Sequence, residues 1–246
     1  MQYKNKTVLV TGSSRGIGKA IALAFGRSGC NVVLNASKSL EQLKETKALL
    51  DGEGIPNLAF LVDVSNYEGC KTMFEQIEKK FGTVDILVNN AGISHIGLFT
   101  DMTPKEWKRV LSVNLESALN CTHLAVPAMV SNKEGVILNI SSMWGEVGAS
   151  CEAVYSASKG AVNAFTKAMA KELGPSNIRV NAISCGVIDT EMNACFSEAE
   201  RAALADEIPL MRFGKPEEVG DLAVFLADET AAFLTGKILT LDGGMI

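Results

Sequence analysis

Segments with the pattern of buried strands alternate with segments of helical pattern along the whole sequence, and this alternation constrains the fold more than any other feature. The segment 6–11, with three aliphatic residues at its centre, is typical of a short buried strand, and apolar residues at helical spacing follow at 16–29. Strands that alternate with helices form parallel sheets covered on both faces. The sequence therefore predicts an α/β fold with a doubly wound sheet.

The same pattern continues to the end of the chain without a repeat, a low-complexity tract or a linker. Its 246 residues suffice for one sizeable core, so we expect a single domain over 1–246. Further strands are predicted at 31–35, 58–62, 86–89, 136–140, 178–183 and 238–241, and further helices at 40–50, 67–80, 104–130, around Tyr155 and at 216–226.

The turn after the first strand is rich in glycine, with the spacing Gly-x3-Gly-x-Gly. A strand that leads into a helix through glycines can hold a pyrophosphate, because N–H groups at the helix start point at the anion. Gly12 would permit the tight turn, Gly16 the close approach of the pyrophosphate, and Gly18 the packing of the helix on the sheet. Alternatively, the glycines serve only the turn. The predicted dinucleotide loop consists of Gly12, Ser13, Ser14, Arg15, Gly16, Ile17 and Gly18.

Two other interpretations of this loop fit less well. A Walker phosphate loop needs glycine and a hydroxyl residue where the chain has Ser13 and Ala20. A hydrolase nucleophile elbow, Gly-x-Ser-x-Gly with Ser14 as nucleophile, needs an acid and then a histidine later in the chain. The only histidines are His95 and His123, so the hydrolase would leave half of the protein unused.

The end of the second predicted strand bears on the choice of cofactor. An NAD site carries Asp or Glu about 20 residues after the glycine loop, to bind the ribose hydroxyls. Here the chain has Asn35, Ala36, Ser37 and Lys38, with no carboxylate to repel a 2′-phosphate. Lys38 and the loop's arginine could flank that phosphate, which favours NADP(H).

Tyr155 and Lys159 lie four residues apart in a segment of helical pattern, which places both side chains on one face. An ammonium beside a phenol favours phenolate, so we expect the pKa of Tyr155 to fall from about 10 toward neutrality. Such a tyrosine can exchange a proton with an alcohol or a ketone. The alternative for this pair is a solvated helix face.

Several motifs in a fixed order carry a family resemblance. They are Thr11-Gly-x3-Gly-Ile-Gly18, Asp63-Val64, Asn89-Asn-Ala-Gly92, Asn114, Ser142 and Tyr155-x3-Lys159. Together they resemble the short-chain dehydrogenase/reductase family, and within it the bacterial 3-oxoacyl-[acyl-carrier-protein] reductases. The resemblance implies a Rossmann-type fold with seven strands in the order 3-2-1-4-5-6-7.

The resemblance also implies roles for individual residues. Tyr155 would protonate the substrate oxygen, Ser142 would hydrogen-bond it, Lys159 would hold the nicotinamide ribose, and Asn114 would orient a water. Outside the family, Ser142 would be a turn serine and Asn114 a helix asparagine bonded to nearby backbone. The glycine loop, Ser37 and Lys38 are expected to contact the cofactor. The resemblance adds further cofactor residues, which are Asp63, Val64, Asn90, Ala91, Gly92, Tyr155, Lys159, Gly186, Ile188 and Thr190.

Of these, Asp63 and Val64 would meet the adenine ring. The alternative for Asp63 is the N-cap of the following helix.

The chain departs from the family pattern in two places. Cys185 replaces the usual proline before Gly186, which frees the local φ; the cysteine is either a neutral substitution or an oxidation site. Lys133 fits one of the basic positions that carrier-linked reductases present beside the active-site mouth, but Ser176 stands at another. An acyl carrier protein therefore remains one partner among alternatives, and the substrate could be an oxoacyl thioester, an acyl-CoA, a steroid, a sugar or another small ketone.

A segment at 189–212 is predicted to be a lid over the substrate. Its apolar side chains suggest an apolar acyl group; alternatively, they pack a small helical excursion. These side chains are Met192, Phe196, Leu204, Leu210 and Met211.

Composition limits the partners and the setting. A net charge of −5 with interspersed charges makes neither nucleic acid nor an anionic membrane an evident partner. We expect no membrane span, no signal peptide and no metal site, and six free thiols in the cytoplasm. A homotetramer is expected by resemblance.

Overall fold

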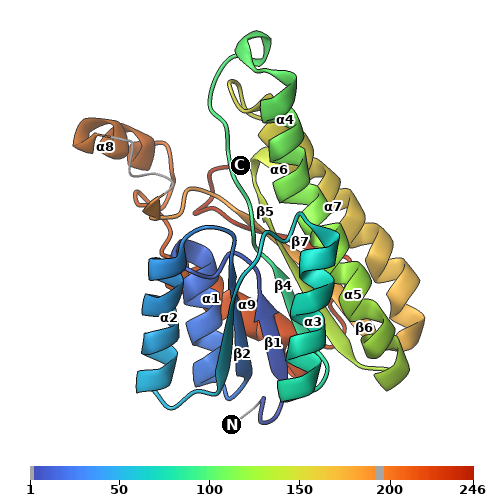
Figure 1. The fold of residues 1–246 in the computed structure, drawn as a ribbon. Helices are drawn as coiled ribbons and strands as arrows, with labels where there is room; N and C mark the ends of the chain where they lie inside the picture. Colours follow the sequence, from blue (N-terminus) through green and yellow to red (C-terminus); the bar gives the residue numbers. More distant parts are fainter. Residues whose placement is uncertain (1–2, 192–196) are drawn as a thin grey trace.

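Seven parallel strands form one sheet in the computed structural model, in the order β3-β2-β1-β4-β5-β6-β7 (Figure 1). This order confirms the predicted fold class. The structure describes residues 3–191 and 197–246, so Met192, Cys195 and Phe196 lie outside the described residues. The strands are β1 (Thr7–Val10), β2 (Asn31–Ala36), β3 (Asn57–Leu61), β4 (Ile86–Asn89), β5 (Gly135–Ser142), β6 (Ile178–Cys185) and β7 (Ile238–Leu241).

Helices cover both faces of the sheet, and each face has its own apolar core. One core lies under α1, α2 and α9, and the other under α3, α5 and α7. The main helices are α1 (Gly16–Arg27), α2 (Leu40–Gly52), α3 (Tyr67–Phe81), α4 (Pro104–Leu111), α5 (Ser117–Asn132), α6 (Trp144–Val147), α7 (Ala153–Leu173), α8 (Glu198–Asp206) and α9 (Pro216–Ala227).

Strand β1 shows why the middle of a central strand here is an unbroken apolar run rather than an alternating pattern. Val8 and Val10 enter the core under α1 and α9, whereas Leu9 enters the core on the opposite face. Because successive side chains of a strand point to opposite faces, a strand covered on both sides needs an unbroken apolar run.

The long helix predicted at 104–130 is interrupted. A single π-helical turn, η2 (Ser112–Glu116), separates α4 from α5. No glycine or proline marks this turn in the sequence, and it holds the buried Asn114. Single π turns inside helices are frequent at functional sites.

One helix was not predicted, and a second corresponds to the helical excursion that the sequence offered as the alternative to a lid. Helix α6 follows β5 directly, and α8 lies within the predicted lid segment, where it stands away from the sheet (Figure 1). Helix α8 begins with a capping box, in which Ser197 and Glu200 bond each other's backbone N–H groups. Among the described residues, no helix is long and apolar enough to cross a membrane.

Candidate active site

The glycine loop after β1 is bonded to the loop after β4. Thr11 Oγ1 accepts hydrogen bonds from the backbone N–H groups of Asn90 (2.9 Å) and Ala91 (3.0 Å). The Asn90 side-chain amide donates to the carbonyls of Thr11 (2.8 Å) and Gly12 (3.0 Å). A Cβ at Gly12, whose φ is +64°, would lie 3.0 Å from Ala91 Cα. Two of the predicted motifs therefore meet at the carboxyl edge of the sheet.

Helix α1 begins at Gly16 with its N-terminus open to an anion. The N-cap residue Arg15 makes no side-chain cap bond, and the first turn contains no acidic residue. Such a helix end presents N–H groups and the positive end of the helix dipole. A Cβ at Gly18 would lie 2.4 Å from both Gly12 O and Asn90 Nδ2, so its small size lets the first turn of α1 approach the loop that follows β1.

Asn35 braces the glycine loop from the end of β2. Its side-chain oxygen accepts a bond from Gly12 N (3.3 Å), and its backbone exchanges bonds with Ser13. Its side-chain amide donates to Val62 O (2.9 Å). Asn35 therefore holds the glycine loop in place, in addition to being an uncharged residue where an NAD site has a carboxylate. The sequence pattern did not reveal this structural role. Ser37 and Lys38 follow it and are exposed.

Arg15 is engaged by the first residues of the lid segment. Its Nη1 donates to Glu191 (2.8 Å) and to Gln42 of α2 (3.4 Å), and Gln42 also donates to Glu191. Both charged side chains are more than half exposed. Thr190 lies beside them, since a Cβ at Gly16 would come within 3.4 Å of its methyl group. The predicted lid segment therefore begins beside the glycine loop.

Asp63 ends the third strand region and carries a defined set of contacts. Its Oδ1 accepts bonds from the N–H (3.1 Å) and hydroxyl (2.7 Å) of Ser65, and its Oδ2 pairs with Arg109 of α4 (3.0 Å). Burial raises the pKa of this carboxyl, but the bonds from Ser65 and Arg109 outweigh burial and lower it. The alternative role as N-cap of α3 is wrong, because Asn66 is the cap and accepts from Gly69 N.

Ser142, Tyr155 and Lys159 are brought together by β5 and the start of α7. Lys159 is 5% exposed, and its Nζ donates to Ile140 O (2.8 Å). The same nitrogen lies 5.7 Å from the centroid of the Tyr155 ring. Gly145 of α6 permits this packing, since a Cβ there would lie 2.7 Å from Lys159 C.

Burial determines the charge states of this cluster. It raises the pKa of Tyr155 to about 12, although a hydrogen bond with Ser142 works in the opposite direction. It lowers the pKa of Lys159 to about 8. The expectation that Lys159 lowers the pKa of Tyr155 is wrong for the polypeptide alone. Desolvation of the phenol has the larger effect on its pKa, and the ammonium of Lys159 donates its hydrogen bond to a backbone carbonyl instead.

Asn114 in the π turn connects α5 to the loop after β4 and to α7. It exchanges two hydrogen bonds with the backbone of Ile93 (2.8 and 2.9 Å) and donates to Ser158 Oγ (3.0 Å). A Cβ at Gly92 would lie 3.4 Å from Lys159 Nζ and 3.5 Å from Asn114 Oδ1. The glycine therefore lets the lysine and the asparagine approach the same point.

The loop after β6 differs in part from expectation. Gly186 makes room for Asp242, since a Cβ at Gly186 would lie 2.6 Å from Asp242 Cα. Cys185 is buried, and burial raises the pKa of its thiol to about 12. A thiol that stays protonated is a poor target for oxidation, which favours the neutral substitution. Ile188 is also buried and forms a bridge with Gly214.

The hydrolase alternative finds no support around Ser14. The Ser14 carbonyl accepts a bond from Thr46 Oγ1 (2.9 Å), and His123 is bonded to Tyr67 (2.9 Å) between α3 and α5. Within 3–191 and 197–246, no hydrogen bond joins Ser14 to a histidine. In the same ranges, no three metal-binding side chains are grouped closely enough to hold an ion.

The expected position of Lys133 beside the mouth is wrong within one chain. Lys133 ends α5 just before Gly135, where β5 begins, whereas Ser142 ends β5. A strand of eight residues separates its ends by roughly 23 Å. Ser176 likewise precedes the start of β6. Both residues belong to the opposite edge of the sheet.

Two carboxylates near the site were missed. Glu146 of α6 accepts bonds from Ser184 Oγ (2.5 Å) and Thr240 Oγ1 (3.2 Å), which ties α6 to β6 and β7. Glu152, just before α7, accepts a short hydrogen bond from Ser94. These contacts join segments far apart in the chain, so no local pattern could have indicated them.

Comparisons with known proteins agree with this arrangement. A family model described as enoyl-(acyl carrier protein) reductase matches residues 12–246. The 3-oxoacyl-[acyl-carrier-protein] reductase FabG of Thermotoga maritima is 37% identical over 100% of both chains. The uncharacterized oxidoreductase YmfI of Bacillus subtilis is 39% identical over 98% of both.

Among solved structures, a putative gluconate dehydrogenase from Agrobacterium tumefaciens superposes with a TM-score of 0.95 at 32% identity, covering 99% of this chain and 97% of the other. The motifs, the strand order and these relatives agree: the chain belongs to the short-chain dehydrogenase/reductase family and is an oxidoreductase that acts on CH–OH groups.

Proposed function

We propose that the protein reduces the 3-oxo group of an acyl thioester with NADP(H), as a 3-oxoacyl-[acyl-carrier-protein] reductase of fatty acid synthesis does. The observation that carries this proposal is the cluster of Ser142, Tyr155 and Lys159 at the same sheet edge as the glycine loop. Full-length similarity to a reductase of that name supports the substrate class.

The residues at this edge fit a dinucleotide. The open start of α1 suits a pyrophosphate, and a Cβ at Gly12 would intrude on the loop that holds it. Arg15 and the exposed Lys38 supply positive charge for a 2′-phosphate, and no carboxylate ends β2. When bound, the cofactor would supply the hydride that adds to the carbonyl carbon.

The chain's own residues would donate the proton to the substrate and then replace it. With a pKa of about 12, Tyr155 holds its proton at neutral pH, which is the state that reduction requires. Tyr155 gives this proton to the carbonyl oxygen as negative charge develops there, and Ser142 donates a hydrogen bond to the same oxygen. Lys159 supplies a positive charge beside the resulting phenolate, and Asn114 holds the path by which a water restores the proton.

Another ketone or alcohol is the second candidate for the substrate, and two observations favour it. Lys133 lies at the far edge of the sheet, so within one chain this basic residue is away from the active-site mouth, where a carrier protein would have to dock. A putative gluconate dehydrogenase shares the fold over nearly the whole chain.

Exposed apolar side chains suit two further roles in this proposal, a cover over the substrate and a contact between subunits. Leu210 and Met211 are 63% and 62% exposed, so these side chains are available to cover an apolar substrate. Phe225 and Phe233, on and after α9, are also exposed and suit a contact between subunits of a cytoplasmic homotetramer. Light scattering would give the number of subunits directly.

The decisive assay follows NADPH absorbance with an acetoacetyl carrier protein, acetoacetyl-CoA and a panel of simple ketones and sugar acids. We expect turnover with an oxoacyl thioester and a kcat/KM at least about tenfold above that for the simple ketones. Preference for another ketone would select the second candidate. Binding of NADPH without turnover of any substrate would indicate a regulator, and ester cleavage lost in Ser14→Ala would indicate a hydrolase.

A further inference from the structure

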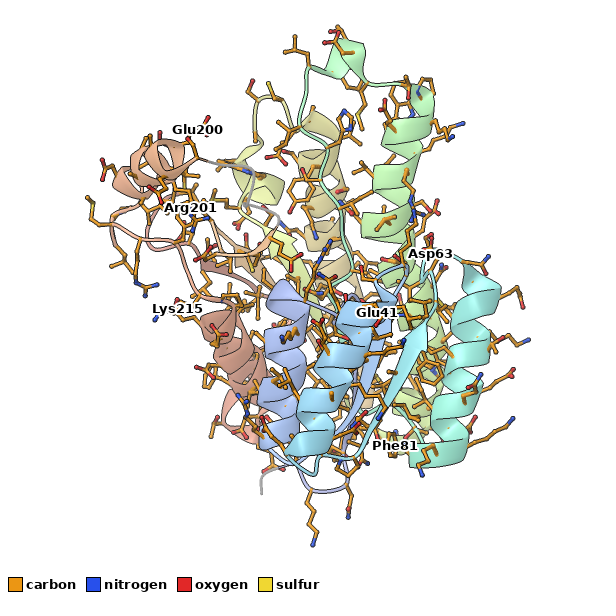
Figure 2. All side chains as sticks on the ribbon, turned by 60° about the vertical axis from the view of Figure 1, so that its left-hand side comes forward. Glu41, Asp63, Phe81, Glu200, Arg201 and Lys215 are labelled. Carbon is orange, nitrogen blue, oxygen red and sulfur yellow. The ribbon has the colours of Figure 1, made fainter. Side chains whose placement is uncertain are left out.

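Arg109 is the only described basic side chain that pairs with Asp63, although it comes from a helix that the cofactor motifs do not include. It lies on α4, one turn before the π turn that holds Asn114. Figure 2 shows Asp63 at the upper edge of the sheet, near the lower end of α4. The ion pair therefore joins α4 to the loop after β3, where the adenine end of the cofactor is expected.

The Asp63 carboxylate is held at both oxygens. Oδ1 accepts two bonds from Ser65, and Oδ2 lies 3.0 Å from Arg109 Nη1. The same Arg109 nitrogen donates to Ser65 Oγ (3.3 Å), so the three side chains form a closed cycle. A carboxylate fixed in this way keeps lone pairs for one further donor, and it accepts hydrogen bonds without donating any.

The backbone of the same loop is also braced. Val64 O accepts bonds from Asn120 Nδ2 of α5 (3.1 Å) and from Cys70 Sγ of α3 (3.2 Å). Removing Arg109 would therefore release Oδ2 of Asp63, while Oδ1 stays bonded to Ser65 and the loop backbone stays attached. A change in ligand binding in an Arg109 variant can then be attributed to the Asp63 side chain rather than to a displaced loop.

We propose that Arg109 is a positioning residue of the adenine subsite, which orients the Asp63 carboxylate to accept a hydrogen bond from the 6-amino group of the base. The inference rests on the proposed dinucleotide function. Arg109 does not touch the reacting atoms; it acts through Asp63. The side chains of the pair are 40% and 38% exposed, so ligand can reach the carboxylate.

The test compares the binding of NADPH with that of its reduced hypoxanthine analogue, in which an oxygen replaces the 6-amino group, followed by nicotinamide fluorescence. We expect the native protein to prefer NADPH by about tenfold, the effect of one hydrogen bond to a charged acceptor. Arg109→Leu should lose most of this preference, and Arg109→Lys should restore part of it. Lys108→Leu, a change at the neighbouring exposed residue, should keep it.

Asp63→Asn gives a second route to the same conclusion. If Arg109 acts through Asp63, Arg109→Leu should add little to the loss of preference already caused by Asp63→Asn. Equal weakening of both nucleotides in Arg109→Leu, or an unchanged preference, would overturn the inference while leaving the reductase function intact. Failure of the native protein to bind either nucleotide would refute the proposed function itself, and the inference with it.

Discussion

The ammonium of Lys159 donates a hydrogen bond of 2.8 Å to Ile140 O and lies 5.7 Å from the centroid of the Tyr155 ring. The lysine is thus tied to the strand that ends in Ser142, and the tyrosine stands above it on α7. This arrangement holds a positive charge in a buried place next to a protonated phenol. A protonated phenol is the form that can donate a proton to a substrate.

The pH dependence of reduction should reflect Lys159. Burial lowers the pKa of Lys159 to about 8, whereas Tyr155, with a pKa of about 12, stays protonated well above neutrality. We therefore expect kcat/KM for ketone reduction to be level below about pH 7, to reach half of that level near pH 8 and to fall further as the ammonium loses its proton. Initial rates from pH 6 to pH 9.5 would show this; a flat profile to pH 9.5 would contradict it.

Lys159→Met should stabilise the fold while it abolishes activity. At neutral pH the native protein carries a desolvated ammonium, and its removal should gain about 1–2 kcal/mol, or a rise in Tm of about 2–8 °C. The folded state binds fewer protons at Lys159 than the unfolded state between pH 8 and 10.5, so native stability rises with pH in that window. The advantage of Lys159→Met should shrink there, as calorimetry can measure; a lower Tm for the variant at pH 7 would argue against a desolvated charge.

Arg15 and Glu191 should have opposite effects on the choice of cofactor. Arg15→Ala should weaken NADPH binding by about tenfold and leave NADH binding unchanged, because only NADPH carries the 2′-phosphate. Glu191→Gln should strengthen NADPH binding by about two- to fivefold, since it removes a competing carboxylate from an exposed ion pair. Arg27→Ala, which breaks an exposed ion pair with Glu53, is the control. Equal effects on both nucleotides would argue against a phosphate site at Arg15.

Most of the fold could be predicted because the central strands are buried on both faces. Unbroken apolar runs such as β1 and β4 predicted strands within one residue at either end, and the family resemblance supplied the strand order that periodicity cannot. The π turn at Ser112–Glu116 escaped prediction because Asn114 is held by Ile93 and Ser158, which are distant in sequence.

The sequence predicted which residues form the site, but not how their side chains are arranged and bonded in the fold. The motif residues at the ends of β1, β4 and β5 do meet at one edge, as parallel strands require. The effect of burial on Tyr155 and the position of Lys133 depend on tertiary packing, which a motif does not contain. The roles assigned to the cofactor and catalytic residues stay predictions until ligands and variants are measured.

Tyr155→Phe tests the central claim most directly. The change removes one hydroxyl, so the variant should bind NADPH within about twofold of the native protein, and its kcat for ketone reduction should fall by about 10³-fold or more. Single-turnover kinetics with saturating NADPH separate the chemical step from binding and product release. Loss of the chemical step with binding retained is the predicted result; a variant that keeps more than about a tenth of the native rate would show that another group donates the proton.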